Sequence, residues 1–189
     1  NVDLIDYADV RKKLGIDTTD FIFIFVGRIV KDKGMNELVN AFVKLQALKH
    51  SVHLILIGPE EGDLNPVADE TRKHIETNKN ILALGQQADI RHYLLSSNAL
   101  VLPSYREGFG MVLIEAGALG LPCITTDISG CNEIIIPGEN GEIIPVRNEN
   151  ALYEKMKEWV EQPEKVALMA SKARNLVENR FEQKIVWNE

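Results

Sequence analysis

Two glutamates eight positions apart have the residue type and spacing of a site for a charged or hydroxyl-rich ligand. Glu107 and Glu115 enclose the segment Glu107-Gly-Phe-Gly-Met-Val-Leu-Ile-Glu115. Glu107 lies in a glycine-bearing turn after the apolar run 99–103, whereas Glu115 lies inside the apolar run 111–119. A buried carboxylate is costly unless other groups donate hydrogen bonds to it. The pair is therefore either an ordinary polar turn or a ligand site.

Each glutamate has a structural interpretation beside the functional one. Glu115 could accept two hydrogen bonds from a vicinal diol such as that of ribose, or it could simply extend its carboxylate to solvent. Glu107 alone is typical of a surface turn. Gly108 and Gly110 would let the backbone approach a bound group closely. The amides of residues 110–112 would be the unpaired donors at the start of a helix.

A second candidate is the segment Gly27-Arg-Ile-Val-Lys-Asp-Lys-Gly34, which follows the apolar run 21–26. Arg28 offers a planar fork suited to phosphate oxygens, and Lys33 offers a point charge. The alternative is a solvated basic loop. The spacing is not that of a phosphate-binding P-loop, which requires Gly-x-x-x-x-Gly-Lys-Ser/Thr.

Other polar residues are weaker candidates. Gln86 and Gln87 follow an apolar run and could meet a nucleobase edge, although a plain polar loop is the simpler interpretation. Ser104 has no histidine near it in sequence, so a serine nucleophile is not favoured. The chain contains no Asp-x-Asp, and its four histidines are scattered. We therefore expect no metal and no cofactor, and the charge of any diphosphate would fall on Arg28, Lys33 and a helix N-terminus.

Composition excludes several classes of protein. The net charge is −7, which argues against nucleic acid as a principal partner. The apolar runs are far shorter than the roughly 20 residues that span a bilayer. The two cysteines have no Cys-x-x-Cys spacing and indicate reduced thiols in a cytoplasmic protein.

Apolar runs alternate with amphipathic segments along the chain, which predicts a parallel sheet between helices. We expect one doubly wound, Rossmann-like α/β domain. In such sheets ligands bind at the carboxyl ends of the strands, where both candidate segments lie. The predicted strands are 21–26, 52–57, 81–84, 99–102, 123–126 and 141–144, and the predicted helices are 6–14, 33–49, 65–77, 89–96, one from 111, 149–161 and 163–179.

Taken together, the motifs resemble a known family. Gly27-Arg28-x4-Lys33-Gly34 followed by Glu107-x7-Glu115 closely resembles the second domain of family 4 retaining glycosyltransferases of the GT-B fold. The stretch from Glu107 to Pro122 fits that pattern nearly residue for residue. Ser129-Gly-Cys-Asn-Glu-Ile-Ile135 and Gly138-Glu-Asn-Gly141 are also similar to family segments.

The resemblance implies a domain that binds a nucleotide-sugar donor, with UDP as the nucleotide. Arg28 and Lys33 would hold the diphosphate and stabilise the charge on it as it leaves. Glu115 would bind the ribose hydroxyls, and Glu107 would lie near the reacting carbon of the sugar, positioning it rather than forming a covalent bond. Further donor contacts would come from Gly27, Gln87, Phe109, Gly110, Met111 and Val112.

The resemblance also implies an organisation larger than this chain. Residues 1–18 resemble an interdomain linker and first helix, and residues 162–189 the C-terminal helices of a donor domain. Both ends read as internal sequence, so we expect a piece of a longer protein whose acceptor-binding N-terminal domain is absent. That domain would bind a glycan or a lipid-linked sugar at the inner membrane face, and the fragment alone would not transfer sugar. A non-catalytic nucleotide-binding module and a sugar-nucleotide epimerase of similar fold are the alternatives.

Overall fold

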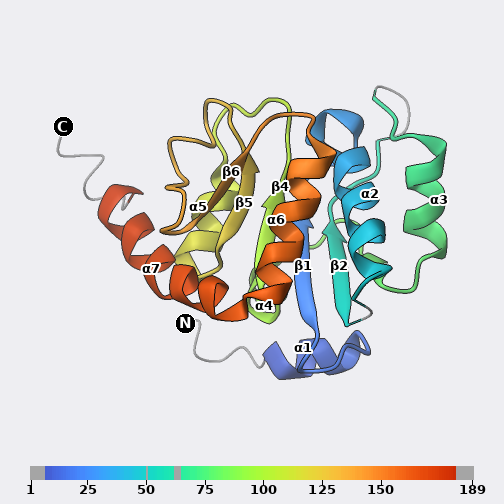
Figure 1. The fold of residues 1–189 in the computed structure, drawn as a ribbon, viewed down its shortest axis with the longest axis horizontal. Coiled ribbons are helices and arrows are strands. Elements are labelled where there is room, and N and C mark those ends of the chain that lie inside the picture. Colours follow the sequence, from blue (N-terminus) through green and yellow to red (C-terminus); the bar gives the residue numbers. More distant parts are fainter. Residues whose placement is uncertain (1–6, 50, 62–64, 182–189) are drawn as a thin grey trace.

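Six parallel strands form a single sheet in the order β3-β2-β1-β4-β5-β6 (Figure 1). The computed structural model describes residues 7–49, 51–61 and 65–181. The strands are β1 (Phe21–Val26), β2 (Val52–Ile57), β3 (Ile81–Ala83), β4 (Ala99–Leu102), β5 (Cys123–Thr126) and β6 (Gly141–Ile144). The predicted doubly wound, Rossmann-like sheet is confirmed.

Seven α-helices and one short 3-10 helix are present in the described residues. They are α1 (Tyr7–Lys13), η2 (Lys31–Lys33), α2 (Met35–Gln46), α3 (Asp69–Thr77), α4 (Arg91–Ser96), α5 (Met111–Ala118), α6 (Glu149–Glu161) and α7 (Pro163–Phe181). Helices α2, α3 and α6 lie on one side of the sheet and α4 and α5 on the other, while α7 packs against both α6 and α5 (Figure 1).

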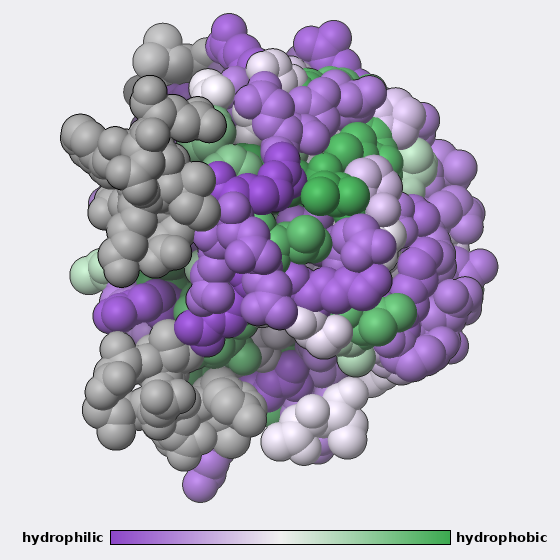
Figure 2. All heavy atoms as spheres, turned by 90° about the vertical axis from the view of Figure 1, so that its left-hand side faces the viewer, coloured by the Kyte–Doolittle hydropathy of each residue, from purple (hydrophilic) through white to green (hydrophobic). Residues whose placement is uncertain are grey.

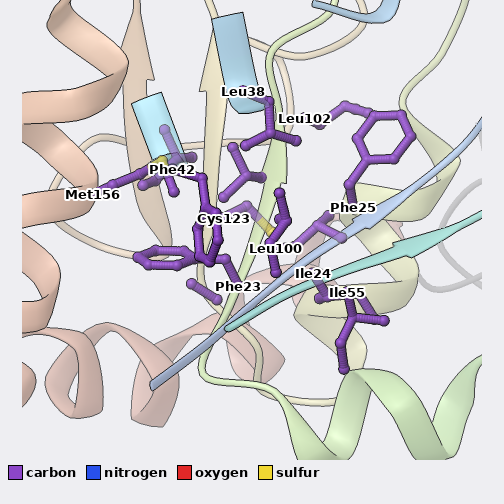
Figure 3. Packing of buried hydrophobic residues seen from close by; sticks show 14 of the residues in the cluster. Phe23, Ile24, Phe25, Leu38, Phe42, Ile55, Leu100, Leu102, Cys123 and Met156 are labelled. Atoms are coloured by element: carbon purple, nitrogen blue, oxygen red, sulfur yellow. The ribbon is translucent and has the colours of Figure 1, made fainter. Parts of the chain in front are cut away.

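Strand β1 is the centre of the core because it is apolar along its whole length. The side chains of its first five residues are buried, as expected of a strand covered on both faces. It pairs with β2 along all six residues and with β4 at Phe23 and Ile24. Figure 3 shows Phe23 together with Phe42 of α2 and Met156 of α6, and all three side chains are fully buried.

The order of the strands reverses direction at β1. The chain moves from β1 outward to β2 and β3, then returns to place β4 on the other side of β1. At such a switch point the connections that leave β1 and β4 go to opposite faces of the sheet, so a crevice opens between their carboxyl ends. The fold thus places the segments after β1 and β4 at the usual position of a ligand.

The helix predicted over residues 33–49, which follows β1, begins two residues later than expected. Residues 31–33 form η2, Gly34 takes a left-handed conformation with φ of 70°, and α2 begins at Met35. A Cβ atom on Gly34 would lie 2.1 Å from the carbonyl oxygen of Pro103, which follows β4. Gly34 thus separates η2 from α2, and its contact with Pro103 leaves no room there for a side chain.

Other predicted bounds differ at helix ends. Helix α3 begins at Asp69 instead of residue 65, because the residue before Pro66 is disfavoured in a helix. Helix α4 begins at Arg91 instead of residue 89, since the Asp89 carboxylate accepts a hydrogen bond from the Arg91 amide at 3.0 Å. Helix α7 extends to Phe181. Residues 1–6 of the predicted linker and first helix, and residues 182–189 of the predicted C-terminal segment, lie outside the described residues.

The face of the molecule that carries α7 has little continuous apolar area (Figure 2). On the side that carries α7, hydrophilic residues cover most of the face and hydrophobic residues form small separate areas (Figure 2). The large apolar side chains that are exposed among the described residues are Leu48, Phe109, Met111, Ile136 and Leu168. Within the same residues, no helix has both the length and the apolar character needed to cross a membrane.

We expect Gly34→Ala to destabilise the domain more than Gly138→Ala. Both glycines have positive φ, 70° and 78°, so both changes incur about 1–2 kcal/mol of backbone strain. A Cβ on Gly138 meets nothing within 4 Å, whereas one on Gly34 overlaps Pro103, which adds about 1–3 kcal/mol. Urea denaturation of the two variants measures this difference. Equal free energies of unfolding would show that the β1 and β4 connections are not in close contact.

Candidate functional site

Lys33 and Glu107 form an ion pair across the switch point of the sheet. Lys33 ends η2 after β1, and Glu107 follows β4. Lys33 Nζ lies 2.5 Å from Glu107 Oε1, and the two side chains are only 18% and 14% exposed. Glu107 is therefore not the surface-turn residue of the simpler interpretation. The structure brings together two of the residues that the sequence singled out from segments 74 positions apart.

Hydrogen bonds fix the loop that carries Glu107. The fully buried Ser104 donates from Oγ to Glu107 Oε1 at 2.7 Å, the same oxygen that Lys33 binds. Thr126, at the end of β5, donates from Oγ1 to the Ser104 carbonyl at 2.5 Å. The Tyr105 amide donates to the Asp32 carbonyl at 2.8 Å. The carboxylate is thus held by the connections of three neighbouring strands, which preorganises it.

Tyr105 ties the same loop to α2. Its hydroxyl donates to Glu37 Oε1 at 2.6 Å, and the guanidinium of Arg147 lies 4.6 Å above its ring. Burial, together with the hydrogen bond to Glu37, raises the pKa of the Tyr105 hydroxyl. Tyr105 therefore stays neutral and acts as a hydrogen-bond donor over the whole physiological range of pH.

Arg28 lies in a separate polar cavity. This cavity, of about 360 Å³, is lined by Arg28, Val30, Asp32, Glu61, Asn65 and Arg106. Arg28 donates from Nη1 to Glu61 Oε2 at 2.7 Å, and Arg106 donates from Nη2 to Asp32 Oδ2 at 2.8 Å. A hydrogen bond from the Asn65 side chain and the charge of Arg106 lower the pKa of Asp32. Both cations of this cavity are thus paired with carboxylates.

Glu115 is exposed on α5, so its carboxylate can reach solvent or a ligand. The helix buries Leu113, Ala116 and Gly117 and directs Glu115 away from the core. Glu115 lines a cavity of about 470 Å³ whose other lining residues are mostly apolar and come from the β3 connection, α4 and α5: Ala88, Asp89, Ile90, Arg91, Leu94, Ala118 and Leu119. A carboxylate at the rim of an apolar pocket suits a ligand with hydroxyls and a flat apolar part.

Gln87 does not line either of these cavities. Its Nε2 donates to the Leu84 carbonyl at 2.7 Å, and its Oε1 accepts from the Tyr93 hydroxyl at 3.2 Å. Gln87 thus shapes the loop beside the Glu115 cavity, which the neighbouring Ala88 lines, and its contact with a nucleobase stays a prediction. Gly27, beside Arg28, donates its amide to the Ile57 carbonyl at 2.9 Å.

The amides before α5 are less available than the sequence predicted. The Gly110 amide donates to the Gly130 carbonyl at 2.9 Å, and the Met111 amide donates to the Phe109 carbonyl at 2.8 Å. Both amides thus already have backbone acceptors within the protein. Val112 is partly buried. The side chains of Phe109 and Met111 are exposed, at 46% and 55%.

Sequence reasoning missed Glu61 and the apolar lining of the Glu115 cavity. Glu61 follows β2, and most of the cavity lining follows β3. The carboxyl ends of these two strands lie at the same edge of the sheet as those of β1 and β4. The position of Glu61 after a buried strand was the available signal. The described residues contain no group of three or more His, Cys, Asp or Glu side chains that could hold a metal ion, and Cys123 and Cys131 are free and buried.

Comparisons with known proteins agree on one family. The family model described as "Glycosyl transferases group 1" matches residues 6–176. The capsular polysaccharide biosynthesis glycosyltransferase CapM of Staphylococcus aureus is 33% identical over 170 residues, which cover 90% of this chain and 44% of CapM. The chain thus spans less than half the length of this curated relative.

Solved structures share the fold. HepE of Anabaena, in complex with UDP and glucose, superposes with a TM-score of 0.86 at 23% identity, over 100% of this chain and 54% of HepE. The C-terminal domain of the group 1 glycosyltransferase LpcC of Francisella tularensis superposes with a TM-score of 0.82 at 21% identity, over 97% of this chain and 98% of that one. The fold is that of one half of a GT-B glycosyltransferase.

We expect Ser104→Ala to destabilise the domain by about 1.5–3 kcal/mol, because it removes a hydrogen bond to a mostly buried carboxylate. Ser171→Ala is the matched control, since the Ser171 hydroxyl bonds the Leu168 carbonyl on an exposed part of α7; its effect should stay within about 0.5 kcal/mol. Urea denaturation compares the two. A Ser104→Ala variant as stable as Ser171→Ala would contradict the role of Ser104 in fixing Glu107.

Proposed function

This chain belongs to the glycosyl transferases group 1 family, and on that basis we propose that it is the donor-binding domain of a retaining, family 4 glycosyltransferase. The donor is a nucleoside diphosphate sugar, with UDP as the nucleotide. The acceptor is a polysaccharide or glycolipid precursor. The Lys33–Glu107 pair at the switch point is the observation that carries this proposal. The UDP bound to HepE and the capsular role in the name of CapM support the donor and acceptor classes.

Three parts of the donor bind to different groups of the site. The nucleoside occupies the cavity of about 470 Å³, with the base against its apolar lining and the ribose hydroxyls on Glu115. Lys33 and Arg28 bind the diphosphate. Glu107, held 2.5 Å from Lys33, positions the sugar beside the diphosphate that leaves it. Each part of the donor thus meets a group of matching chemistry.

The cations supply the electrostatic part of catalysis. Negative charge grows on the diphosphate as the bond to the sugar breaks, and fixed positive groups stabilise that charge more than they stabilise the ground state. We assign this work to Lys33 and Arg28 without a metal ion. Glu107 contributes positioning and its charge near the reacting carbon; it does not form a covalent intermediate.

The acceptor is bound by a part of the enzyme outside this chain. The chain spans 44% of CapM, and the C-terminal domain of LpcC matches it nearly end to end. We therefore assign this chain to the C-terminal half of the enzyme. We place the enzyme in the cytoplasm or at the inner membrane face. By itself it binds donor and transfers no sugar, and appreciable transfer by residues 1–189 alone would contradict this assignment.

We expect Arg28→Ala to weaken UDP binding about 10- to 150-fold, the loss of a charge-assisted hydrogen bond of about 1.5–3 kcal/mol. Calorimetry with UDP measures the dissociation constant. Arg72→Ala is the control, because Arg72 pairs with Glu60 on the surface and should leave UDP binding unchanged. An Arg28→Ala variant that bound UDP as tightly as the parent chain would remove Arg28 from the diphosphate site.

We expect the two glutamates to respond differently to replacement by glutamine. Glu115→Gln should weaken both uridine and UDP about 10-fold, because the ribose loses a charged acceptor. Glu107→Gln should leave UDP binding undiminished and weaken only the UDP-sugar. Calorimetry with UDP and UDP-sugar, and NMR titration with uridine, separate these effects. If Glu107→Gln weakened UDP itself, the division between nucleotide and sugar would be wrong.

A further inference from the structure

The polar cavity at Arg28 is electrically balanced. Arg28 pairs with Glu61 at 2.7 Å, and Arg106 pairs with Asp32 at 2.8 Å. Each guanidinium on the cavity wall therefore already bonds a carboxylate. An anion that entered this cavity would meet guanidinium groups that already bond carboxylates, so a diphosphate binds Arg28 in competition with Glu61.

Backbone pairing places Glu61 beside Arg28. The connections after β1 and β2 stay side by side beyond the ends of their strands: the Ile29 amide donates to the Pro59 carbonyl at 2.9 Å, and Ile29 forms a parallel bridge with Glu60. Arg28 and Glu61 flank this bridge. The backbone pairing thus brings the two residues close together, and their partly exposed side chains complete the contact.

The Arg28–Glu61 pair is the more easily exchanged of the two ion pairs formed by the proposed diphosphate ligands. Its side chains are 55% and 41% exposed, whereas those of Lys33 and Glu107 are 18% and 14% exposed. Water screens an exposed pair, and such pairs are worth only about 0–1 kcal/mol. A diphosphate carries more negative charge than a carboxylate and presents several oxygens, so it can replace Glu61 on the guanidinium.

We propose that Glu61 occupies the anion position of Arg28 until the donor's diphosphate displaces it. Glu61 is then a positioning residue: it keeps the guanidinium at the edge of the site and competes with the donor for it. This inference rests on the proposed function, which assigns Arg28 to the diphosphate. It adds that the affinity for donor is set partly by a residue that the bound donor does not need.

A pair of neighbouring substitutions tests this proposal. Glu61→Gln removes the competing charge, so we expect UDP to bind roughly two- to five-fold more tightly, as loss of a weak exposed pair allows. Glu60→Gln makes the same change of net charge one residue away, but Glu60 lies 3.2 Å from Arg72. We expect UDP affinity to be unchanged in Glu60→Gln. Calorimetry at fixed ionic strength compares both with the parent chain.

The Arg28→Ala background shows whether the effect passes through Arg28. The gain from Glu61→Gln should vanish in the double variant, because no guanidinium remains to be released. A Glu61→Gln affinity equal to that of Glu60→Gln, or a gain that persists without Arg28, would overturn the inference. If Arg28→Ala itself left UDP binding unchanged, the proposed role of Arg28 would fail first, and the inference would fail with it.

Discussion

The burial of β1 on both faces constrains where charged groups can lie in this molecule. Its five leading side chains are buried, and β2 and β4 flank it. Residues of the β1 and β4 connections that carry charge, such as Lys33 and Glu107, therefore lie beyond the ends of the strands. Because the strands are parallel, those ends meet at one edge, and the polar residues of several connections gather there. The site is a consequence of a core that excludes charge.

The same constraint explains why the site groups are paired with one another. Lys33 and Glu107 are mostly buried, and a lone ion in that position would be costly to desolvate. Each satisfies the other, and Ser104 adds a second hydrogen bond to the same glutamate oxygen. Arg28 and Glu61 form a looser version of this arrangement nearer to solvent. The edge of the sheet thus holds two cations that are each paired with a carboxylate. A charged ligand can exchange partners with these pairs.

The strand pattern made most of the fold predictable. Five of the six strands have the predicted bounds, and β3 ends one residue early. The errors lie where a distant contact decides the local structure. Gly34 interrupts the helix predicted from Lys33 with a left-handed φ of 70°, and Pro103 lies against it where a side chain would be. Tertiary contacts override helix propensity in this way at many helix ends.

The candidate site was predictable in its residue types and less so in its geometry. The pairing of Lys33 with Glu107 follows from the order of the strands, which periodicity does not provide. Glu115 is exposed because α5 buries Leu113, Ala116 and Gly117 on another face, and the apolar run around Glu115 does not specify which face is buried. The Gln87 side chain and the Gly110 amide are engaged in the loops themselves. Such side-chain and amide partners are set by loop conformation, which single residues do not specify.

The contact between Gly110 and Gly130 extends the site into a region that no ligand need touch. The Gly110 amide bonds the Gly130 carbonyl, and a Cβ on Gly130 would lie 2.7 Å from the carbonyl oxygen of Gly108. The loop of Glu107 therefore rests on the connection after β5. The placement of Glu107 therefore depends on a residue 23 positions further along the chain, and a side chain at Gly130 could displace the carboxylate without altering it.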